Sequence, residues 1–477
     1  MVVNQEFKAL IEAHYDEFLR DLAKVIEVQS VRGPADLHAP FGKGPRQVLR
    51  VAVKLADQYG FKTSIVNDAV AVAQWGPDTS DYIGIVGHLD VVAAGEGWQS
   101  DPFKLNIRED ILYGRGVLDN KGPIMAVLFG MHLLKERGFY PRKTLRIIFG
   151  SDEESGSADI PLYLKEQPAP EFGFTPDCKF PAVYGERGIV NYEIDTPIKL
   201  AALQQISTIT GDQAKDHVPD QLAIEVQNQL VEVQGKRSPS NAPELGVNAI
   251  MLLAKAIKKR AELAPELVTY FDWLLDSFDQ RYFGEGLGID FQDEDSGKLM
   301  VTPYLLQKVE GGLKLRIAIR YPVTVTEEQV TAGLKKAVLP GSELRVVRRI
   351  PGTMHDKNDP RIKQLSAVYA MVTGQDGTPV TTTGATYARA VPNIIAFGPS
   401  FPGQKGIAHK QDEWMTNHDL KLNMEIYMNA MVGLAKMEEK KWQIGQRLPP
   451  GEWHTTEFWK PVKCWKKMQV REMPLKV

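Results

Sequence analysis

The hydrophobic and polar positions of this 477-residue chain follow different periods in its different parts. Residues 6–28 place apolar side chains three and four positions apart, which predicts an amphipathic helix, and a second helix is expected over 45–59. Apolar runs at 82–87 and 144–149 predict buried strands, and 121–135 between them predicts a helix. Strand, helix and strand in this order favour an α/β sheet with chemistry at the strand ends.

The middle of the chain, from about 189 to 350, has a different pattern. Alternating stretches occur at 223–233, 312–320 and 343–348, and a helix is expected over 247–264. Antiparallel strands with helices on one side are typical of such a segment.

The length also requires more than one core, because single cores stop growing at about 250–300 residues. A helix-rich pattern returns from Asp359 and closes with an apolar helix near 420–437. We therefore predict one domain from residues 1–188 and 351–440, and a second domain, 189–350, inserted into it.

Composition narrows the classes of function. The chain is 43% hydrophobic and 25% charged with a net charge of −3, which gives no reason to expect nucleic acid or a membrane as a partner. The N-terminus lacks the apolar core of a signal peptide, and no later segment has the ~20 apolar residues of a membrane span. Two cysteines, Cys178 and Cys464, argue against a disulfide framework. We expect a cytoplasmic protein.

Histidine and carboxylate residues gather in clusters at 87–92, 114–122, 150–156 and 408–413, and Asp177 joins them as a further candidate ligand. Zinc takes imidazole nitrogen and carboxylate oxygen, and two ions about 3.5–4 Å apart can clamp the oxygens of a hydrolysis. Such a pair needs a bridging carboxylate. We predict that His88 and Asp177 hold one metal and Glu154 and His409 the other, with Asp119 between them.

Two further carboxylates have predicted supporting roles. Asp90 lies two residues beyond His88, on the same face if the strand continues, and could accept its second imidazole N–H. Glu153 is the candidate general base for metal-bound water. Each cluster alone is typical of a satisfied polar pair, a solvated face or a turn, so the prediction depends on their joint occurrence at strand ends.

In this order the motifs resemble the zinc-dependent aminoacylase, carboxypeptidase and dipeptidase superfamily, and within it the bacterial dipeptidases of the PepV type. The resemblance covers residues 5–438 and is strongest in GHLDVV, GWQSDPF, LYGRGVLDNKGP, SDEESGS, FTPD and AHKQDE. It implies a zinc-peptidase-like α/β catalytic domain with a mixed central sheet, and an inserted α+β lid domain. It also implies two Zn²⁺ ions, with Mn²⁺ or Co²⁺ as alternatives, the same five ligands, Glu153 as the base and Asp90 behind the histidine.

The resemblance extends to the substrate side. It implies that Arg320 binds a substrate carboxylate, which suits the planar fork of arginine. Gly384 and Thr386, with Arg389, resemble the family's loop at the C-terminal end of the substrate.

The lid segment departs from the family pattern. Pro239 occupies the position of a histidine that donates to the developing oxyanion, and proline has no side-chain donor. Asp216 replaces an asparagine, and an ionised aspartate can only accept. Loss of one oxyanion donor typically costs ~10²–10³ in rate. His217 is a candidate surrogate donor.

We therefore expect a dinuclear zinc hydrolase that cleaves an amide bond in a dipeptide or a related small carboxylate-bearing substrate, acting as a monomer or homodimer. The alternatives are an N-acyl amino acid deacylase on the same scaffold, or a metal-binding homologue with weak or no peptidase activity because of Pro239. The basic, tryptophan-rich extension at 441–477 carries eight Lys/Arg against three Glu. It could bind nucleic acid or anionic surfaces, but packing against its own domain or a partner subunit is favoured.

Overall fold

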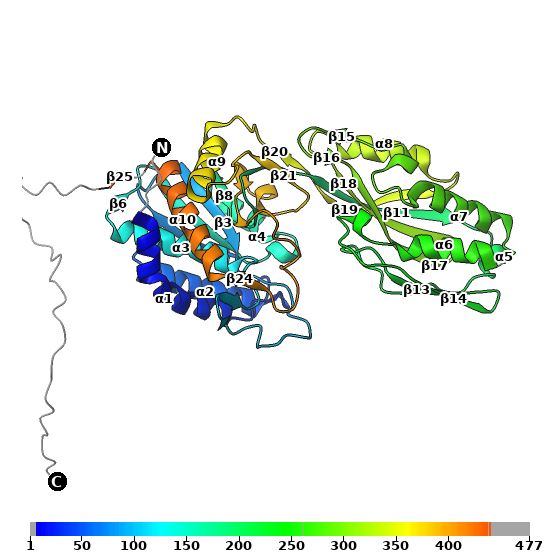
Figure 1. Cartoon of the computed structure of the whole chain (residues 1–477), viewed down its shortest axis with the longest axis horizontal. Coiled ribbons are helices and arrows are strands. Elements are labelled where there is room, and N and C mark those ends of the chain that lie inside the picture. Colours follow the sequence, from blue (N-terminus) through cyan, green and yellow to red (C-terminus); the bar gives the residue numbers. More distant parts are fainter. Residues whose placement is uncertain (1–5, 261, 437, 440–477) are drawn as a thin grey trace, which may run out of the picture. The chain divides into compact units, whose positions relative to one another are not determined.

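Two sheets organise the residues that the computed structural model describes, which are 6–260, 262–436 and 438–439 (Figure 1). The predicted extension at 441–477 lies outside the described residues. The larger sheet is mixed and follows the order β1 (Lys62–Val66), β2 (Val70–Trp75), β7 (Thr144–Gly150), β3 (Tyr82–His88), β8 (Phe172–Thr175), β22 (Ile394–Ala396), β10 (Val183–Glu186) and β20 (Thr353–Met354), with β21 (Val380–Thr382) paired to β10.

Both faces of this larger sheet are buried. Ile83 and Ile85 of β3 belong to one core, and Tyr82 and Val86 belong to a smaller core on the other side with α4 (Asp159–Glu166). Burial on both faces explains why these strands are continuous apolar runs in the sequence. The first core is completed by α1 (Glu6–Ile26), α2 (Lys43–Gln58), α3 (Lys121–Glu136), α9 (Pro360–Thr373) and α10 (Asn417–Leu434).

The predicted helices and strands of this part are confirmed to within a few residues at each end. No helix within the described ranges combines the length and the hydropathy that crossing a bilayer requires.

The second sheet is antiparallel and has the order β17 (Met300–Val309), β18 (Gly312–Tyr321), β11 (Gly188–Pro197) and β19 (Glu343–Ile350). It forms a separate core with α6 (Ala249–Arg260), α7 (Pro265–Phe278) and α8 (Glu327–Ala337). A small sheet of β12 (Thr210–Gly211), β13 (Gln221–Val226) and β14 (Gln229–Gln234) contacts α6 through β13 and β14. The fold is therefore an α/β part with an inserted α+β lobe, as predicted.

Short elements complete the described chain: β4 (Asn106–Arg108), β5 (Ile111–Tyr113), β6 (Phe139–Tyr140), β9 (Cys178–Lys179), α5 (Leu200–Leu203), β15 (Gln292–Asp293), β16 (Gly297–Lys298), β23 (Pro399–Ser400), β24 (Trp414–Thr416) and β25 (Glu438–Glu439).

Two segments of the inserted lobe differ from their predictions. The stretch 223–233, predicted as one alternating segment, is a hairpin of β13 and β14. Gln227 and Asn228 at its turn both have positive φ, 50° and 63°, as in the type I′ turns that suit hairpins. The helix predicted over 247–264 ends at Arg260, and Pro265 begins α7, a position that proline favours.

The chain passes from the larger sheet to the second sheet at Arg187, between β10 and β11, and returns between Ile350 and Thr353. We propose that the domain boundaries lie at these two crossings.

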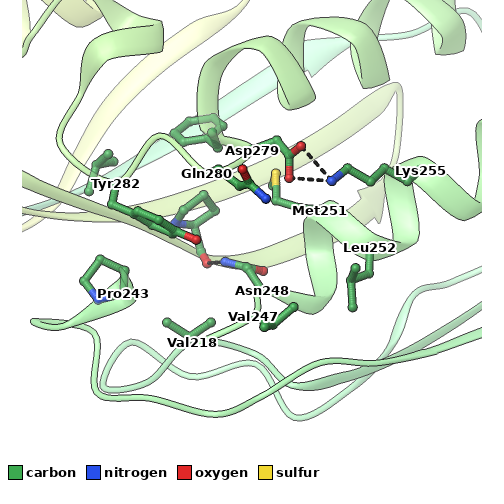
Figure 2. A pocket seen from close by; sticks show the side chains of 13 residues that line it. Val218, Pro243, Val247, Asn248, Met251, Leu252, Lys255, Asp279, Gln280 and Tyr282 are labelled. Carbon is green, nitrogen blue, oxygen red and sulfur yellow. Dashed lines mark hydrogen bonds and ion pairs between the residues drawn. The ribbon is translucent and has the colours of Figure 1, made fainter. Parts of the chain in front are cut away.

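A cavity of about 150 Å³ lies inside the inserted lobe, near α6 and the start of β17 (Figure 2). Val218 and Met251 are among its apolar lining, and Lys255 and Asp279 form an ion pair of 2.6 Å beside them. No histidine lines it and Asp279 is its one carboxylate. This cavity therefore lacks the ligands that metal chemistry would require.

Gly173 lies in β8 where the neighbouring β3 leaves no room for a side chain. A Cβ at this position would lie 1.7 Å from the carbonyl oxygen of Gly84. We expect Gly173→Ala to lower the free energy of unfolding, measured by chemical denaturation, by about 3 kcal/mol, the upper part of the usual range for overpacking. Gly33→Ala is the control, because the nearest atom to its Cβ would be 3.9 Å away. Equal losses in both variants would contradict the close packing of β8 against β3.

Candidate metal centre

The predicted metal ligands meet at one edge of the larger sheet. β3 runs parallel to both β7 and β8, so the carboxyl ends of the three strands lie together. His88 is the last residue of β3, Glu153 and Glu154 begin a 3₁₀ turn just after β7, and Asp177 follows β8. The carboxyl ends of parallel strands are where open α/β sheets hold ligands.

Asp119 lies just before α3 and joins the two histidines. Its Oδ1 is 3.1 Å from Nε2 of His88, and its Oδ2 is 3.0 Å from Nε2 of His409. His409 has a positive φ of 63°, a conformation that costs a non-glycine residue about 1–2 kcal/mol. The two oxygens of one carboxylate thus face two imidazoles, as a carboxylate that bridges two metal ions must.

The remaining ligands complete two sides of this arrangement. Glu154 Oε2 is 3.0 Å from His409 Nε2, and Asp177 Oδ1 is 3.6 Å from His88 Nε2. Two sets of ligand atoms lie mutually within 4.8 Å, namely those of His88, Glu153 and Asp177, and those of His88, Asp119 and Glu154. All five predicted ligands are therefore brought together. Glu153, predicted as a base beside the metals, also has a carboxylate oxygen close enough to His88 and Asp177 to share a metal ion with them.

The electrostatics of the cluster favour a bound cation. Burial raises the pKa of Asp177 to about 7, and burial followed by the charge of Asp177 raises the pKa of Glu153 well above its usual value. Hydrogen bonds with Asp119 and Glu154 raise the pKa of His409 to about 11. Carboxylates gathered out of water must be protonated, paired or bound to metal. Imidazole nitrogens and carboxylate oxygens are donors that suit zinc and similar divalent ions.

Asp90 supports the cluster in a different way from the prediction. β3 ends at His88, and the backbone carbonyl oxygen of Asp90 accepts the hydrogen bond from His88 Nδ1 at 2.9 Å, whereas the carboxylate lies 3.6 Å from that nitrogen. The carboxylate instead accepts from the backbone N–H groups of Glu153 and Glu154, at 3.2 and 3.1 Å. Asp90 therefore orients the histidine through its backbone and the glutamate turn through its side chain.

Glu413 is a positioning residue that sequence reasoning missed. Its buried carboxylate accepts hydrogen bonds from the Arg115 guanidinium at 2.8 Å and from the backbone N–H groups of Gly116, Leu118 and Asp119 at 3.0–3.2 Å. These bonds fix the loop that presents the bridging carboxylate. Glu413 belongs to the 408–413 motif, but its backbone partners lie far earlier in the chain and leave no sequence signal.

Arg320, the predicted carboxylate-binding residue, lies in β18. Its Nη1 donates to the carbonyl oxygen of Thr383 at 2.6 Å, and it pairs with no carboxylate of the described chain. Burial, then the charges of Arg389, Arg348 and Arg187, lower the pKa of Arg320 to about 10. Arg320 is therefore a partly desolvated cation that an anionic ligand would stabilise.

Thr386 and Arg389 are held by Glu186, which sequence reasoning also missed. The buried Glu186 carboxylate accepts from Thr386 Oγ1 at 2.6 Å and from Arg389 Nε at 2.5 Å. Both terminal nitrogens of Arg389 donate to carbonyl oxygens, one of which belongs to Gly384. In this structure Arg389 positions the loop at 384–389, and it also lies in the wall of the cavity next to that loop.

A cavity of about 710 Å³ extends from the metal centre to this loop. Glu153 and Glu154 line it together with Thr386 and Arg389, and Lys215 of the inserted lobe is also in its wall. A ligand in the cavity would therefore reach the candidate metal ligands and the predicted substrate loop together.

His217, the predicted surrogate donor, is not among the residues that line this cavity. Its imidazole lies between Asp216 and Asp212, at 3.0 and 3.4 Å, and its backbone pairs with Pro239. Lys215, two residues earlier, lines the cavity instead.

This fold is shared with known metallopeptidases. The structure is similar to human carnosine dipeptidase 1, with a TM-score of 0.58 and 16% identity over 91% of this chain and 99% of that one. It is also similar to the YXEP protein of Bacillus subtilis, described as a dinuclear metal binding peptidase, with a TM-score of 0.53 and 11% identity over 89% and 99% of the two chains.

Comparison of sequences assigns the family. Residues 84–432 match the profile of peptidase family M20/M25/M40. The Beta-Ala-Xaa dipeptidase of Lactobacillus delbrueckii subsp. lactis is 30% identical over 474 residues, which cover 91% of this chain and 99% of that protein. The chain therefore belongs to peptidase family M20/M25/M40, which confirms the predicted resemblance.

Removal of the Glu413 carboxylate should destabilise the protein, because Arg115 and three backbone N–H groups would lose a buried acceptor. We expect Glu413→Ala to lower the free energy of unfolding by about 3–5 kcal/mol, the usual cost of breaking a buried ion pair. Glu310→Ala, in the exposed turn between β17 and β18, is the control. A loss in Glu413→Ala no greater than in this control would contradict the assigned role.

Proposed function

We propose that this protein is a dizinc peptidase that hydrolyses the amide bond of dipeptides with a free C-terminal carboxylate. The observation that carries the proposal is Asp119, whose two oxygens face His88 and His409. The relative named Beta-Ala-Xaa dipeptidase and the dinuclear metal-binding description of the similar YXEP protein support it. Mn²⁺ or Co²⁺ would suit the same nitrogen and oxygen donors.

The five ligands divide between two ions. His88 and Asp177 would hold one ion, His409 and Glu154 the other, and Asp119 both. When bound, such a pair supplies a water of lowered pKa and stabilises charge on the attacked carbonyl group. Glu153 takes the proton from the water and delivers it to the leaving amine. Burial raises the pKa of Glu153, which suits a group that must accept and return a proton near neutral pH.

The other end of the cavity orients the substrate. Arg320 pairs with no carboxylate of the described chain, and its planar guanidinium would bind the terminal carboxylate through parallel N–H donors. The loop at 384–386 lies beside it, because the Arg320 guanidinium donates to the carbonyl oxygen of Thr383. The cavity of about 710 Å³ between this loop and the glutamates Glu153 and Glu154 is ample for a dipeptide.

Two alternatives follow from particular residues. Arg320 would bind the carboxylate of an N-acyl amino acid as well as that of a dipeptide, so a deacylase is the second candidate. Pro239 supplies no oxyanion donor, so weak or absent peptidase activity is the third. Mass spectrometry of a mixture of dipeptides and N-acyl amino acids, incubated with the zinc-loaded protein, separates the three. We expect dipeptides to be consumed; cleavage of acyl substrates alone selects the deacylase, and no cleavage selects the third.

Substitution of the adjacent glutamates should separate proton transfer from metal binding. We expect Glu153→Ala to lower kcat by ~10²–10⁴ with zinc content unchanged, because general-base catalysis contributes about that much. Glu154→Ala should lose zinc. Kinetics and metal analysis of both variants, with exposed Glu166→Ala as the control, measure this. Loss of zinc in Glu153→Ala alone would reverse the two assignments, an outcome that matters because Glu153 lies within ligand distance of His88 and Asp177.

A further inference from the structure

The wall of the active-site cavity contains more positive charge than one substrate carboxylate can neutralise. Lys215 and Arg348 line the cavity, and Arg320 bonds the loop that forms part of its wall. We propose that the site selects substrates whose C-terminal residue has an acidic side chain, aspartate or glutamate. The proposal rests on the proposed function, because it adds a second anionic group to a dipeptide that Arg320 already holds.

The other two arginines of the wall already have carboxylate partners. Arg349 pairs with Glu327 through two hydrogen bonds of 2.8 and 3.1 Å, and Arg389 pairs with Glu186 at 2.5 Å. By contrast, no carboxylate in the described part of the chain pairs with Lys215 or Arg348. These two cations therefore remain available to a ligand.

Strand register places Arg320 and Arg348 on one face of the second sheet. Arg320 lies opposite Ile189 of β11, and Arg348 lies opposite Asn191, two residues further along the same strand. Residues two apart on a strand share a face, and so do residues directly opposite one another. The two arginines therefore flank β11 from either side, on the same face.

Further along β11, the arginines on the same face are paired with carboxylates. Glu193 pairs with Arg316 of β18 and Arg345 of β19, both at 2.7 Å, and Asp195 also pairs with Arg345. Towards the cavity, the corresponding positions of β11 are Ile189 and Asn191, which bring no negative charge. Carboxylates are thus missing where the sheet reaches the cavity and present where it does not, and this contrast points to a ligand as the missing anion.

The charge count indicates two anionic groups. Lys215, Arg320 and Arg348 together carry three positive charges without a carboxylate partner. A terminal carboxylate bound by Arg320 leaves Lys215, which is exposed, and Arg348, which is half-buried, and two like charges in one cavity wall disfavour each other. Arg348 shares the cavity wall with Thr386, on the loop predicted for the C-terminal end of the substrate. The second anion therefore belongs to the side chain of the C-terminal residue.

Ala-Glu and Ala-Gln test the proposal, because they have nearly the same shape and differ in one charge. We expect the zinc-loaded protein to have a kcat/KM about tenfold higher for Ala-Glu, the effect of a hydrogen bond to a charged group. The preference should fall with rising salt, since Lys215 is exposed and Arg348 is only half-buried. Lys215→Met/Arg348→Gln should abolish it. Lys54→Met/Arg50→Gln, on the exposed side of α2, should retain it.

Calorimetric binding of both peptides to zinc-loaded Glu153→Gln keeps this test separate from that of the proposed function. Tighter binding of Ala-Glu without turnover of any dipeptide by the wild type would support the selection of an acidic C-terminal residue and overturn the peptidase assignment. Turnover of both peptides with equal kcat/KM would overturn the selection of an acidic residue alone. A preference that survives in Lys215→Met/Arg348→Gln would also overturn it, and so would failure of both peptides to bind.

Discussion

The contact of one carboxylate with two imidazoles is the constraint on which the rest of this structure depends. Asp119 must stand between His88 and His409, at 3.1 and 3.0 Å, although these residues come from a strand end, a loop before a helix and a distant loop. Buried carboxylates repel one another and resist desolvation, so this arrangement needs both a rigid support and a compensating cation.

The support comes from carboxylate side chains that bind backbone groups of the site loops. Glu413 binds the backbone of the Asp119 loop, and Asp90 binds the backbone of the Glu153–Glu154 turn. Glu186 does the same for the loop of Thr386. In each case a buried carboxylate accepts backbone N–H groups of a loop that carries a site residue, so the loops are ordered before a ligand binds. The cavity is acidic at Glu153 and Glu154 and basic at Lys215 and Arg348, and Arg320 is bonded to the loop next to it. Such a polarity would orient a substrate with its carboxylate away from the metals.

The sequence predicts the parts of this site that depend on regular structure. Buried parallel strands are continuous apolar runs, and polar residues after them must meet at one edge, so His88, Glu154 and Asp177 could be placed together. Contacts made by backbone groups have no such signal. The three backbone N–H groups that donate to Glu413 and the backbone carbonyl groups that accept from Arg389 could belong to any residue type, so the sequence does not indicate them. The turn at Gln227 and Asn228 contains no glycine, so the sequence does not predict the hairpin there. The chemistry of its imidazole makes His217 a candidate donor in the sequence, but Lys215, two residues earlier, is the residue of this loop that lines the cavity.

Anomalous X-ray scattering at the zinc edge, from crystals of the zinc-loaded protein, tests directly whether Asp119 bridges two ions. We expect two peaks about 3.5–4 Å apart, the usual separation in two-metal hydrolases. One peak should lie beside His88 and Asp177 and the other beside Glu154 and His409, with one oxygen of Asp119 bound to each. A single peak, or two peaks of which only one contacts Asp119, would show that Asp119 does not bridge two metal ions.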